Sequence, residues 1–401
     1  MTRAGILAVL GLGVTQIIHW GSVFYAIAVL GPSIRAELGL PPEVAYGGLS
    51  LALLTGSLVS TQIGGLIDRI GGRRVMATGS LLCALGLAVL ALAHGLALYA
   101  LGWAILGLAM PMALYEAAFA SLSQVAGSSA RRAITYLTFL GGLASTVSWP
   151  LTNILLQQLG WRQTLLAYAV LTLALCIPLH LLLLIDHAPK SQADAVEKPD
   201  EISEALLATE HRSTAFALLA IALLLQNFIS SGVGVHLLNI LQGLGLDADA
   251  AVLVGVLLGP AQVSGRIAEM MLGGNRPALW TGLAAWGLLP VSFAILLISG
   301  ASTATAAVFS IVYGVSNGLV TIARGTIPLA LFGRSGYGRL LGKLSVPARV
   351  AGALGPIVFA AVDSRLGALA GIWLGGAVAL AAFAALIALW QYAARNSLRA
   401  A

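Results

Sequence analysis

Several ionisable side chains lie inside long apolar segments, where a charge needs a specific reason. They are Glu116, Arg266, Arg324 and Arg349, with Glu269 near the end of its segment. On insertion scales, a charged group at a bilayer centre costs on the order of 2.5–3.5 kcal/mol. The arginines outnumber the acids, and a bound anion would neutralise the excess positive charge. This imbalance therefore favours an anionic small-molecule ligand.

Polar, uncharged side chains lie on the same segments and complete a candidate binding site. His19 can titrate near neutral pH, so it either lines a pocket, carries a proton, or stays neutral and hydrogen-bonded between helices. Arg349 either binds ligand or pairs structurally with Glu116 or Glu269. The predicted substrate-binding residues are His19, Tyr25, Tyr115, Gln262, Arg266, Asn317 and Arg324.

Motifs of enzymes and cofactor-binding proteins do not occur in the sequence. There is no G-x-S-x-G elbow, no H-E-x-x-H pair and no glycine-lysine loop for nucleotide phosphates. Cys83 and Cys176 both lie within apolar runs, and no spacing typical of metal ligands is present. We therefore expect neither enzymatic activity, nor a cofactor, nor a metal, and transport would be driven by a gradient or run passively.

The composition is that of a chain surrounded by lipid. Hydrophobic residues make up 59% and charged residues 9%, whereas a soluble domain carries about 25% charged residues. The mean hydropathy is +0.95. The net charge of +6 comes from basic residues in short loops, which indicates membrane topology rather than nucleic-acid binding.

Long apolar runs predict an all-α integral membrane protein with twelve transmembrane helices. Each run is long enough to span a bilayer, and none alternates as a barrel strand would. The predicted spans are about 5–30, 45–67, 75–94, 97–125, 133–157, 164–185, 214–241, 249–272, 278–299, 303–331, 341–362 and 368–393.

A polar segment, 186–213, separates six predicted helices from six others. It is interpreted as a cytoplasmic linker between an N-terminal bundle, 1–185, and a C-terminal bundle, 214–401. Lys and Arg crowd the loops on one side of the predicted membrane, and the other side carries Arg35, Arg162 and Arg365. The positive-inside rule therefore predicts that both termini are cytoplasmic.

The two halves repeat a short pattern. Gly64 and Asp68 follow the second predicted helix, and Gly265 and Glu269 recur at the same spacing in the eighth. Parallel repeats of this kind produce two pseudo-symmetric bundles with a substrate site at their interface. An acid such as Asp68 at a helix end can accept hydrogen bonds from neighbouring helix N-termini and arginines.

The loop from Gly64 to Arg74 resembles the signature G-x-x-x-D-R-x-G-R-R of the major facilitator superfamily (MFS). Gly64, Asp68, Arg69, Gly71 and Arg73 match, whereas Gly72 replaces the usual arginine. The resemblance implies the MFS fold, a latch that holds the outward-open state, and a cavity lined by helices one, four, seven and ten. The expected coupling or gating residues are Asp68, Arg69, Arg73, Glu116, Glu269 and Arg349.

A weaker likeness points to monocarboxylate-porter-type carriers. Arg131-Arg132-Ala133 before Gly141-Gly142 looks like their entry to helix five, and Arg266 stands where they place a carboxylate-binding arginine. Gln262 replaces the acid that usually precedes that arginine, and His19-Trp20-Gly21 replaces an acidic entry to helix one.

This likeness implies a monomeric secondary active transporter. It would move a small organic anion, with monocarboxylates as one class, by alternating access across a bacterial-type inner membrane, coupled to protons. The alternative is a proton-coupled efflux antiporter for drugs or metabolites, with Glu116 as the proton-linked acid.

Overall fold

The computed structural model describes residues 1–184, 206–272, 276–299 and 302–397. Within these ranges the backbone is almost entirely helical, and the β-structure there is one isolated bridge between Leu207 and Ser397. The prediction of an all-α chain is confirmed. Residues 186–205 of the expected linker, 186–213, lie outside the described residues.

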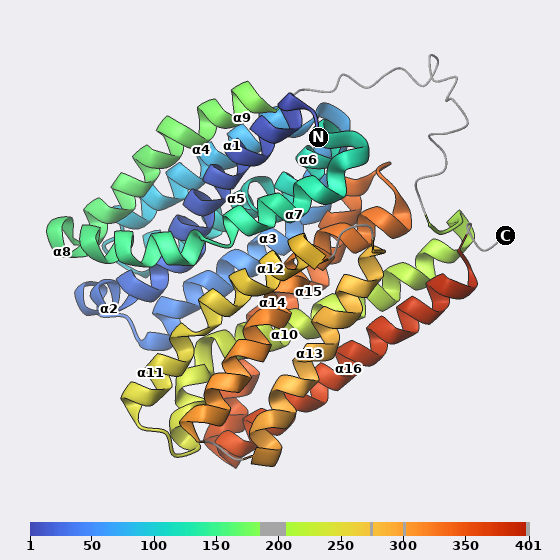
Figure 1. The fold of residues 1–401 in the computed structure, drawn as a ribbon. Helices are drawn as coiled ribbons and strands as arrows, with labels where there is room; N and C mark the ends of the chain where they lie inside the picture. Colours follow the sequence, from blue (N-terminus) through green and yellow to red (C-terminus); the bar gives the residue numbers. More distant parts are fainter. Residues whose placement is uncertain (185–205, 273–275, 300–301, 398–401) are drawn as a thin grey trace. The chain divides into compact units, whose positions relative to one another are not determined.

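The chain divides into two compact units (Figure 1). The first comprises Met1–Asp200 together with Arg334–Val346, and the second comprises Glu201–Gly333 together with Pro347–Ala401. The predicted bundles were continuous in sequence, whereas here the segment Arg334–Val346 packs with the first unit. One long helix, α15 (Tyr337–Leu366), therefore begins in the first unit and continues in the second.

The first unit is built on a mixed aliphatic and aromatic core. Tyr99 and Trp103 pack edge to face at 6.3 Å between ring centroids, and Leu87 and Leu106 are fully buried beside them. Its elements, besides the start of α15, are α1 (Arg3–His19), the π-helical turn η1 (Trp20–Tyr25), α2 (Ala26–Leu38), α3 (Pro42–Ile70), α4 (Gly72–Ala91), α5 (Leu96–Ala113), α6 (Tyr115–Ala126), η2 (Gly127–Ser129), α7 (Ala130–Gly141), α8 (Ala144–Leu171), η3 (Thr172–Cys176) and α9 (Ile177–Leu183).

The second unit has a core of aromatic rings between its long helices. Phe293 packs edge to face on Phe309 at 5.6 Å and on Tyr313 at 6.2 Å, and Trp286 is fully buried. Its elements, besides the rest of α15, are η5 (Thr209–His211), α10 (Arg212–Gly243), α11 (Ala248–Val256), α12 (Leu258–Leu272), α13 (Ala278–Ser299), α14 (Thr303–Phe332) and α16 (Ala368–Arg395).

The described residues contain ten stretches long and apolar enough to cross a membrane. One of them, Leu96–Leu183, covers 88 residues, more than a single crossing uses. It is interrupted where Leu114 is extended and where Gly160 adopts a φ of 79°, a left-handed conformation that favours glycine. The predicted count of twelve helices stays a prediction.

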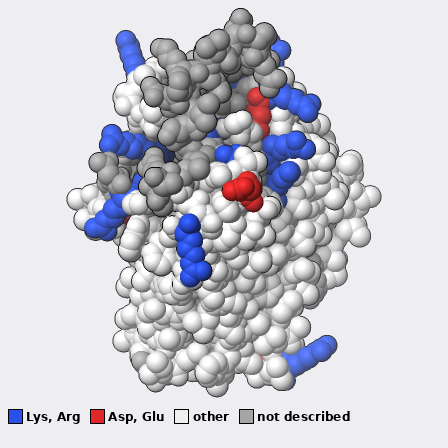
Figure 2. Space-filling model, turned by 90° about the vertical axis from the view of Figure 1, so that its right-hand side faces the viewer, with Lys and Arg blue, Asp and Glu red and all other residues white. Residues whose placement is uncertain are grey.

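The surface is that of a multi-pass membrane protein. Large apolar side chains such as Leu58, Leu182 and Ile298 are at least 74% exposed, which only a lipid environment makes favourable. On the face shown in Figure 2, charged side chains gather toward one end, and the area below them is uncharged except for one basic side chain at the opposite end.

Candidate functional site

Asp68 caps the beginning of α15. Its Oδ1 accepts a hydrogen bond from the backbone N–H of Gly338 and its Oδ2 accepts one from Arg339, both at 2.8 Å. Amides in the first turn of a helix have no acceptor within that helix, and a negative charge is favourable at this end of the helix dipole. The carboxylate of Asp68 therefore fastens the start of α15 to the end of α3.

Glycines let α3 and α15 cross with their backbones in contact. A Cβ placed on Gly64 would lie 2.0 Å from the carbonyl oxygen of Gly338, and one on Gly342 would lie 2.2 Å from that of Ser60. By contrast, a Cβ on Gly65 would lie 3.8 Å or more from its nearest neighbours, which are side-chain atoms of Arg339. The close crossing of α3 and α15 therefore requires a glycine at Gly64 but not at Gly65.

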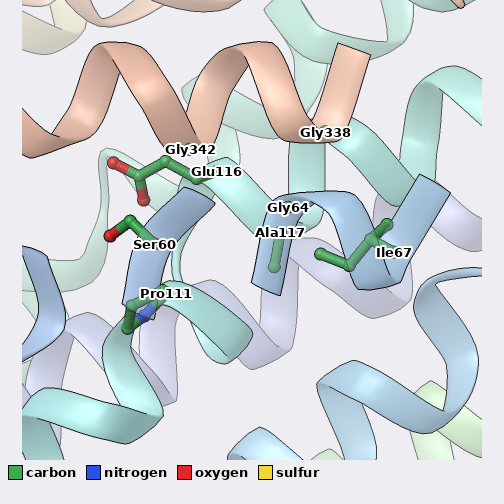
Figure 3. Close-up of a pocket in the computed structure, with 8 residues that line it drawn as sticks. All are labelled: Ser60, Gly64, Ile67, Pro111, Glu116, Ala117, Gly338 and Gly342. Carbon is green, nitrogen blue, oxygen red and sulfur yellow. The ribbon is translucent and has the colours of Figure 1, made fainter. Parts of the chain in front are cut away.

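A narrow pocket lies at this crossing, and Glu116 lines it. Figure 3 shows the side chain of Glu116, from α6, directed toward α15 beside Gly342, with Ser60 of α3 close by. The remaining lining residues are Gly64, Ile67, Pro111, Ala117 and Gly338. The structure thus brings Glu116 to the same crossing as Asp68.

The arginines of the motif have no part in the bonds to Asp68. Arg69 is exposed and Arg73 is half-buried, and the partners of Asp68 are backbone amides. The sequence predicts that Asp68 accepts hydrogen bonds from helix N-termini and from arginines. Among the described residues, its hydrogen bonds come from the N-terminus of a helix.

The second copy of the motif has different neighbours. A Cβ on Gly265 would lie 2.8 Å from the carbonyl oxygen of Val315 on α14, so this glycine mediates a crossing within the second unit. Glu269 accepts a hydrogen bond of 2.6 Å from the hydroxyl of Thr281, in the first turn of α13. The acid of the second copy therefore accepts a hydrogen bond from a side-chain hydroxyl.

Arg266 is buried in the second unit with most of its hydrogen-bonding capacity unused. The residue is 4% exposed, and its Nη2 donates to the hydroxyl of Thr321 at 3.3 Å. Its Nε and Nη1 have no hydrogen-bond partner among the described residues. A guanidinium has five N–H donors, so it can still bind a carboxylate through two parallel hydrogen bonds.

A polar cluster continues from Arg266 into α14 and α10. The hydroxyl of Thr321 donates to the carbonyl of Asn317 at 3.0 Å. Asn317 Oδ1 in turn accepts from Ser230 at 3.2 Å and from Gln226 at 3.4 Å. We call Arg266, Thr321, Asn317, Ser230 and Gln226 the arginine cluster.

The other predicted residues of the second unit lie on α12, α14 and α15 and are buried to different extents. Gln262 is half-buried one turn before Arg266 on α12, so both lie on one side of that helix. Arg324 is half-buried two turns after Asn317 on α14. Arg349 is buried on α15, where 8% of its surface is exposed.

In the first unit, Tyr25 and Tyr115 meet through Trp20. The ring of Trp20 lies 6.3 Å from that of Tyr25 and 5.4 Å from that of Tyr115. His19, the neighbour of Trp20, is completely buried and shares a hydrogen bond of 3.2 Å with Ser80 on α4. Of its sequence-based interpretations, the hydrogen-bonded position between helices describes this placement.

Sequence comparison decides the family. The family model described as Major Facilitator Superfamily matches residues 12–274. The chain belongs to the major facilitator superfamily. It is therefore a membrane transporter of small molecules and not an enzyme, and transporters of this superfamily act as monomers. No curated protein matches the sequence.

A solved MFS structure shares the fold. The crystal structure of the human organic anion transporter MFSD10 (TETRAN) is similar with a TM-score of 0.72 and 17% sequence identity. The match covers 96% of this chain and 100% of the human chain. It supports the MFS fold, and the likeness to monocarboxylate carriers stays a prediction.

The fastening of α15 in this MFS protein is directly measurable. In the Asp68→Ala variant, we expect the amides of Gly338 and Arg339 to exchange hydrogen about tenfold or more faster, because a bond to a charged group contributes about 1.5–3 kcal/mol. Hydrogen–deuterium exchange of the peptide that contains them measures this effect. Unchanged exchange there, with Asp247→Ala at the first residue before α11 as control, would show that Asp68 does not hold α15.

Proposed function

We propose that this MFS transporter is a secondary carrier of a small organic anion, with monocarboxylates as the first class to test. It moves the anion by alternating access, coupled to protons, across a bacterial-type inner membrane. Both termini face the cytoplasm in this proposal, as the distribution of Lys and Arg predicts.

The observation that carries the proposal is the state of Arg266. Its charge lies inside an apolar bundle with Nε and Nη1 unused among the described residues. Such a charge is costly in the membrane unless something compensates it. A carboxylate would supply the missing charge and accept both unused donors in the bidentate geometry that a guanidinium prefers. An anionic substrate therefore explains why this arginine is there.

The remaining residues have supporting roles in this proposal. Gln262, Asn317 and Arg324 contact or orient the anion, and the aromatic group of Tyr25 and Tyr115 with His19 shapes the contribution of the first unit. The residues proposed to gate or couple the cycle are Asp68, Arg69, Arg73, Glu116, Glu269 and Arg349. The similar fold of MFSD10, a human organic anion transporter, supports the substrate class.

Uptake by purified protein in liposomes tests the substrate class. We expect an inward proton gradient to accelerate the entry of at least one labelled monocarboxylate, and protein-free liposomes are the control. A panel of acetate, lactate, pyruvate and succinate separates mono- from dicarboxylates. Movement of a cationic dye, with none of the acids carried, would contradict the proposal and support a drug or metabolite antiporter.

A further inference from the structure

Four buried side chains form a continuous hydrogen-bonded chain inside the first unit. His19 Nε2 lies 3.2 Å from the hydroxyl of Ser80, which lies 3.1 Å from His180 Nδ1. His180 Nε2 lies 3.1 Å from the hydroxyl of Thr15. All four residues are at most 1% exposed, and the two imidazoles stack at 5.8 Å with an angle of 12° between their planes. We call this group the histidine chain.

When both imidazoles are neutral, the histidine chain has one fewer hydrogen to donate than it has hydrogen-bond contacts. The hydroxyl of Thr15 also approaches Leu12 O at 3.0 Å, and that of Ser80 approaches Met76 O at 3.1 Å. These two contacts and the three within the chain make five, and each needs one hydrogen. A neutral imidazole has one N–H and a hydroxyl has one O–H, so the neutral chain supplies four.

One added proton completes every contact, and it belongs on His180. A doubly protonated His180 donates through Nδ1 to Ser80 and through Nε2 to Thr15. Ser80 then accepts from both imidazoles and donates to Met76 O, while Thr15 donates to Leu12 O. A hydroxyl oxygen has two acceptor lone pairs, so this arrangement is allowed.

The same geometry gives a route for the proton. His19 Nδ1 is buried and has no hydrogen-bond partner among the described residues, so it can accept a proton in a state that admits water to it. When a proton binds there, the hydrogen on His19 Nε2 passes to Ser80 Oγ, and the hydrogen of Ser80 passes to His180 Nδ1. Each step breaks one bond to hydrogen and forms another, so Ser80 keeps one hydrogen and His19 ends with its hydrogen on Nδ1. His19 must then return to the tautomer with its hydrogen on Nε2 before Ser80 can donate to Met76 O and every contact has its hydrogen.

The ionisable groups on the neighbouring elements do not bond to either imidazole. Cys83 lies one turn after Ser80 and Cys176 one turn before His180, and both thiols are buried. Tyr168 on α8 bonds to Thr152, and Glu116 on α6 lines the pocket beside α15 (Figure 3). Arg131 and Arg132 lie at the start of α7. Among the described residues, the imidazoles bond to Ser80 and Thr15.

We propose that the histidine chain is the proton-binding site of this transporter, with His180 as the group that holds the proton. The proposal rests on the proton coupling in the proposed function and assigns it to α1, α4 and α9. Among the described residues no carboxylate bonds to His180, and a charge there is costly in an apolar bundle. Protonation is therefore favourable only in a state that admits water to the chain, which makes proton binding depend on conformation.

Nuclear magnetic resonance of ¹⁵N-histidine in the full-length protein in liposomes tests the site without any substrate. We expect the imidazolium signal of His180 to grow as the pH falls and to be absent from His180→Asn, whereas the signals of the other histidines remain in both. The variant Ser80→Ala removes the shared acceptor, so we expect the protonated fraction of His180 at a given pH to fall roughly tenfold. Ser57→Ala, whose hydroxyl donates to Leu54 O on α3, is the matched control.

The outcomes separate this inference from the proposed substrate class. A neutral His180 throughout the titration, or equal protonation in the wild type and Ser80→Ala, would overturn the proton site. If His180 titrates as expected but no organic acid enters liposomes, the proton site stands and the substrate class is wrong. Wild type and Ser80→Ala suffice for this test if His180→Asn does not fold.

Discussion

Replacing Arg266 by Gln is expected to reduce organic-acid uptake in liposomes by about 30-fold or more. Removing one partner of a buried, hydrogen-bonded charge pair costs at least about 2 kcal/mol, which corresponds to that factor in affinity. The Lys variant keeps the charge but loses the planar fork of donors, so we expect uptake between that of the wild type and that of Arg266→Gln. Arg395→Gln, at an exposed position on α16, is the matched control.

The same substitution should not weaken the ligand-free protein. Arg266 has two nitrogens without partners among the described residues, so its removal relieves the cost of a buried charge. We therefore expect Arg266→Gln to unfold at the same temperature as the wild type or higher. A lower unfolding temperature together with lost uptake would instead indicate a structural role for Arg266.

Replacing Gly64 by Ala is expected to destabilise the first unit by about 1–3 kcal/mol, the usual cost of overpacking. The added methyl group would meet the carbonyl oxygen of Gly338, a backbone atom that cannot rotate away. The start of α15 would have to move, and this would lengthen the two bonds from its amides to Asp68. Thermal unfolding and hydrogen exchange at Gly338 measure the two effects.

Gly65 provides the control for this prediction within the same helix. Its added methyl group would meet side-chain atoms of Arg339 at 3.8 Å or more, and alanine is the better helix former. Gly65→Ala should therefore be neutral or stabilise the protein by up to about 1 kcal/mol. Equal destabilisation by both variants would show that the close crossing of α3 and α15 does not constrain this position.

The fold class follows from the sequence, but the breaks within its helices do not. Few charges and long apolar runs allow only membrane-spanning helices, because lipid cannot bond to open strand edges. The π-helical turn Trp20–Tyr25 and the break at Leu114 were not predicted, since each lies inside a run that is apolar enough to form one continuous span. The segment Arg334–Val346 joins the first unit through tertiary contacts, which leave no signal in the sequence.

The candidate site was predictable where a charge marks it. Arg266 and Glu116 stand out because the membrane makes each charge costly, and Asp68 stands out because its loop resembles the signature of the superfamily. The partners of Asp68, Gly338 and Arg339, contribute backbone amides and therefore carry no side-chain signal. Thr321 and Ser230 resemble the many hydroxyls that bond within membrane helices, although Thr321 stands one turn from Asn317.

The histidine chain was beyond sequence reasoning. His180 follows Pro178 near the end of its segment, and nothing in that position indicates a partner. Ser80 and Thr15 are single hydroxyls on two other helices, and only the packing of α1, α4 and α9 brings the three together. The signal available was the presence of two histidines in apolar segments of one unit.

Anion binding to Arg266 is the central claim, and a thermal-shift comparison tests it most directly. A ligand at a hundred times its Kd stabilises a folded protein by about 2.7 kcal/mol. We expect at least one organic acid to raise the unfolding temperature of the wild type and of Arg395→Gln, but to leave that of Arg266→Gln unchanged. An acid that stabilises Arg266→Gln as much as the wild type would contradict the account.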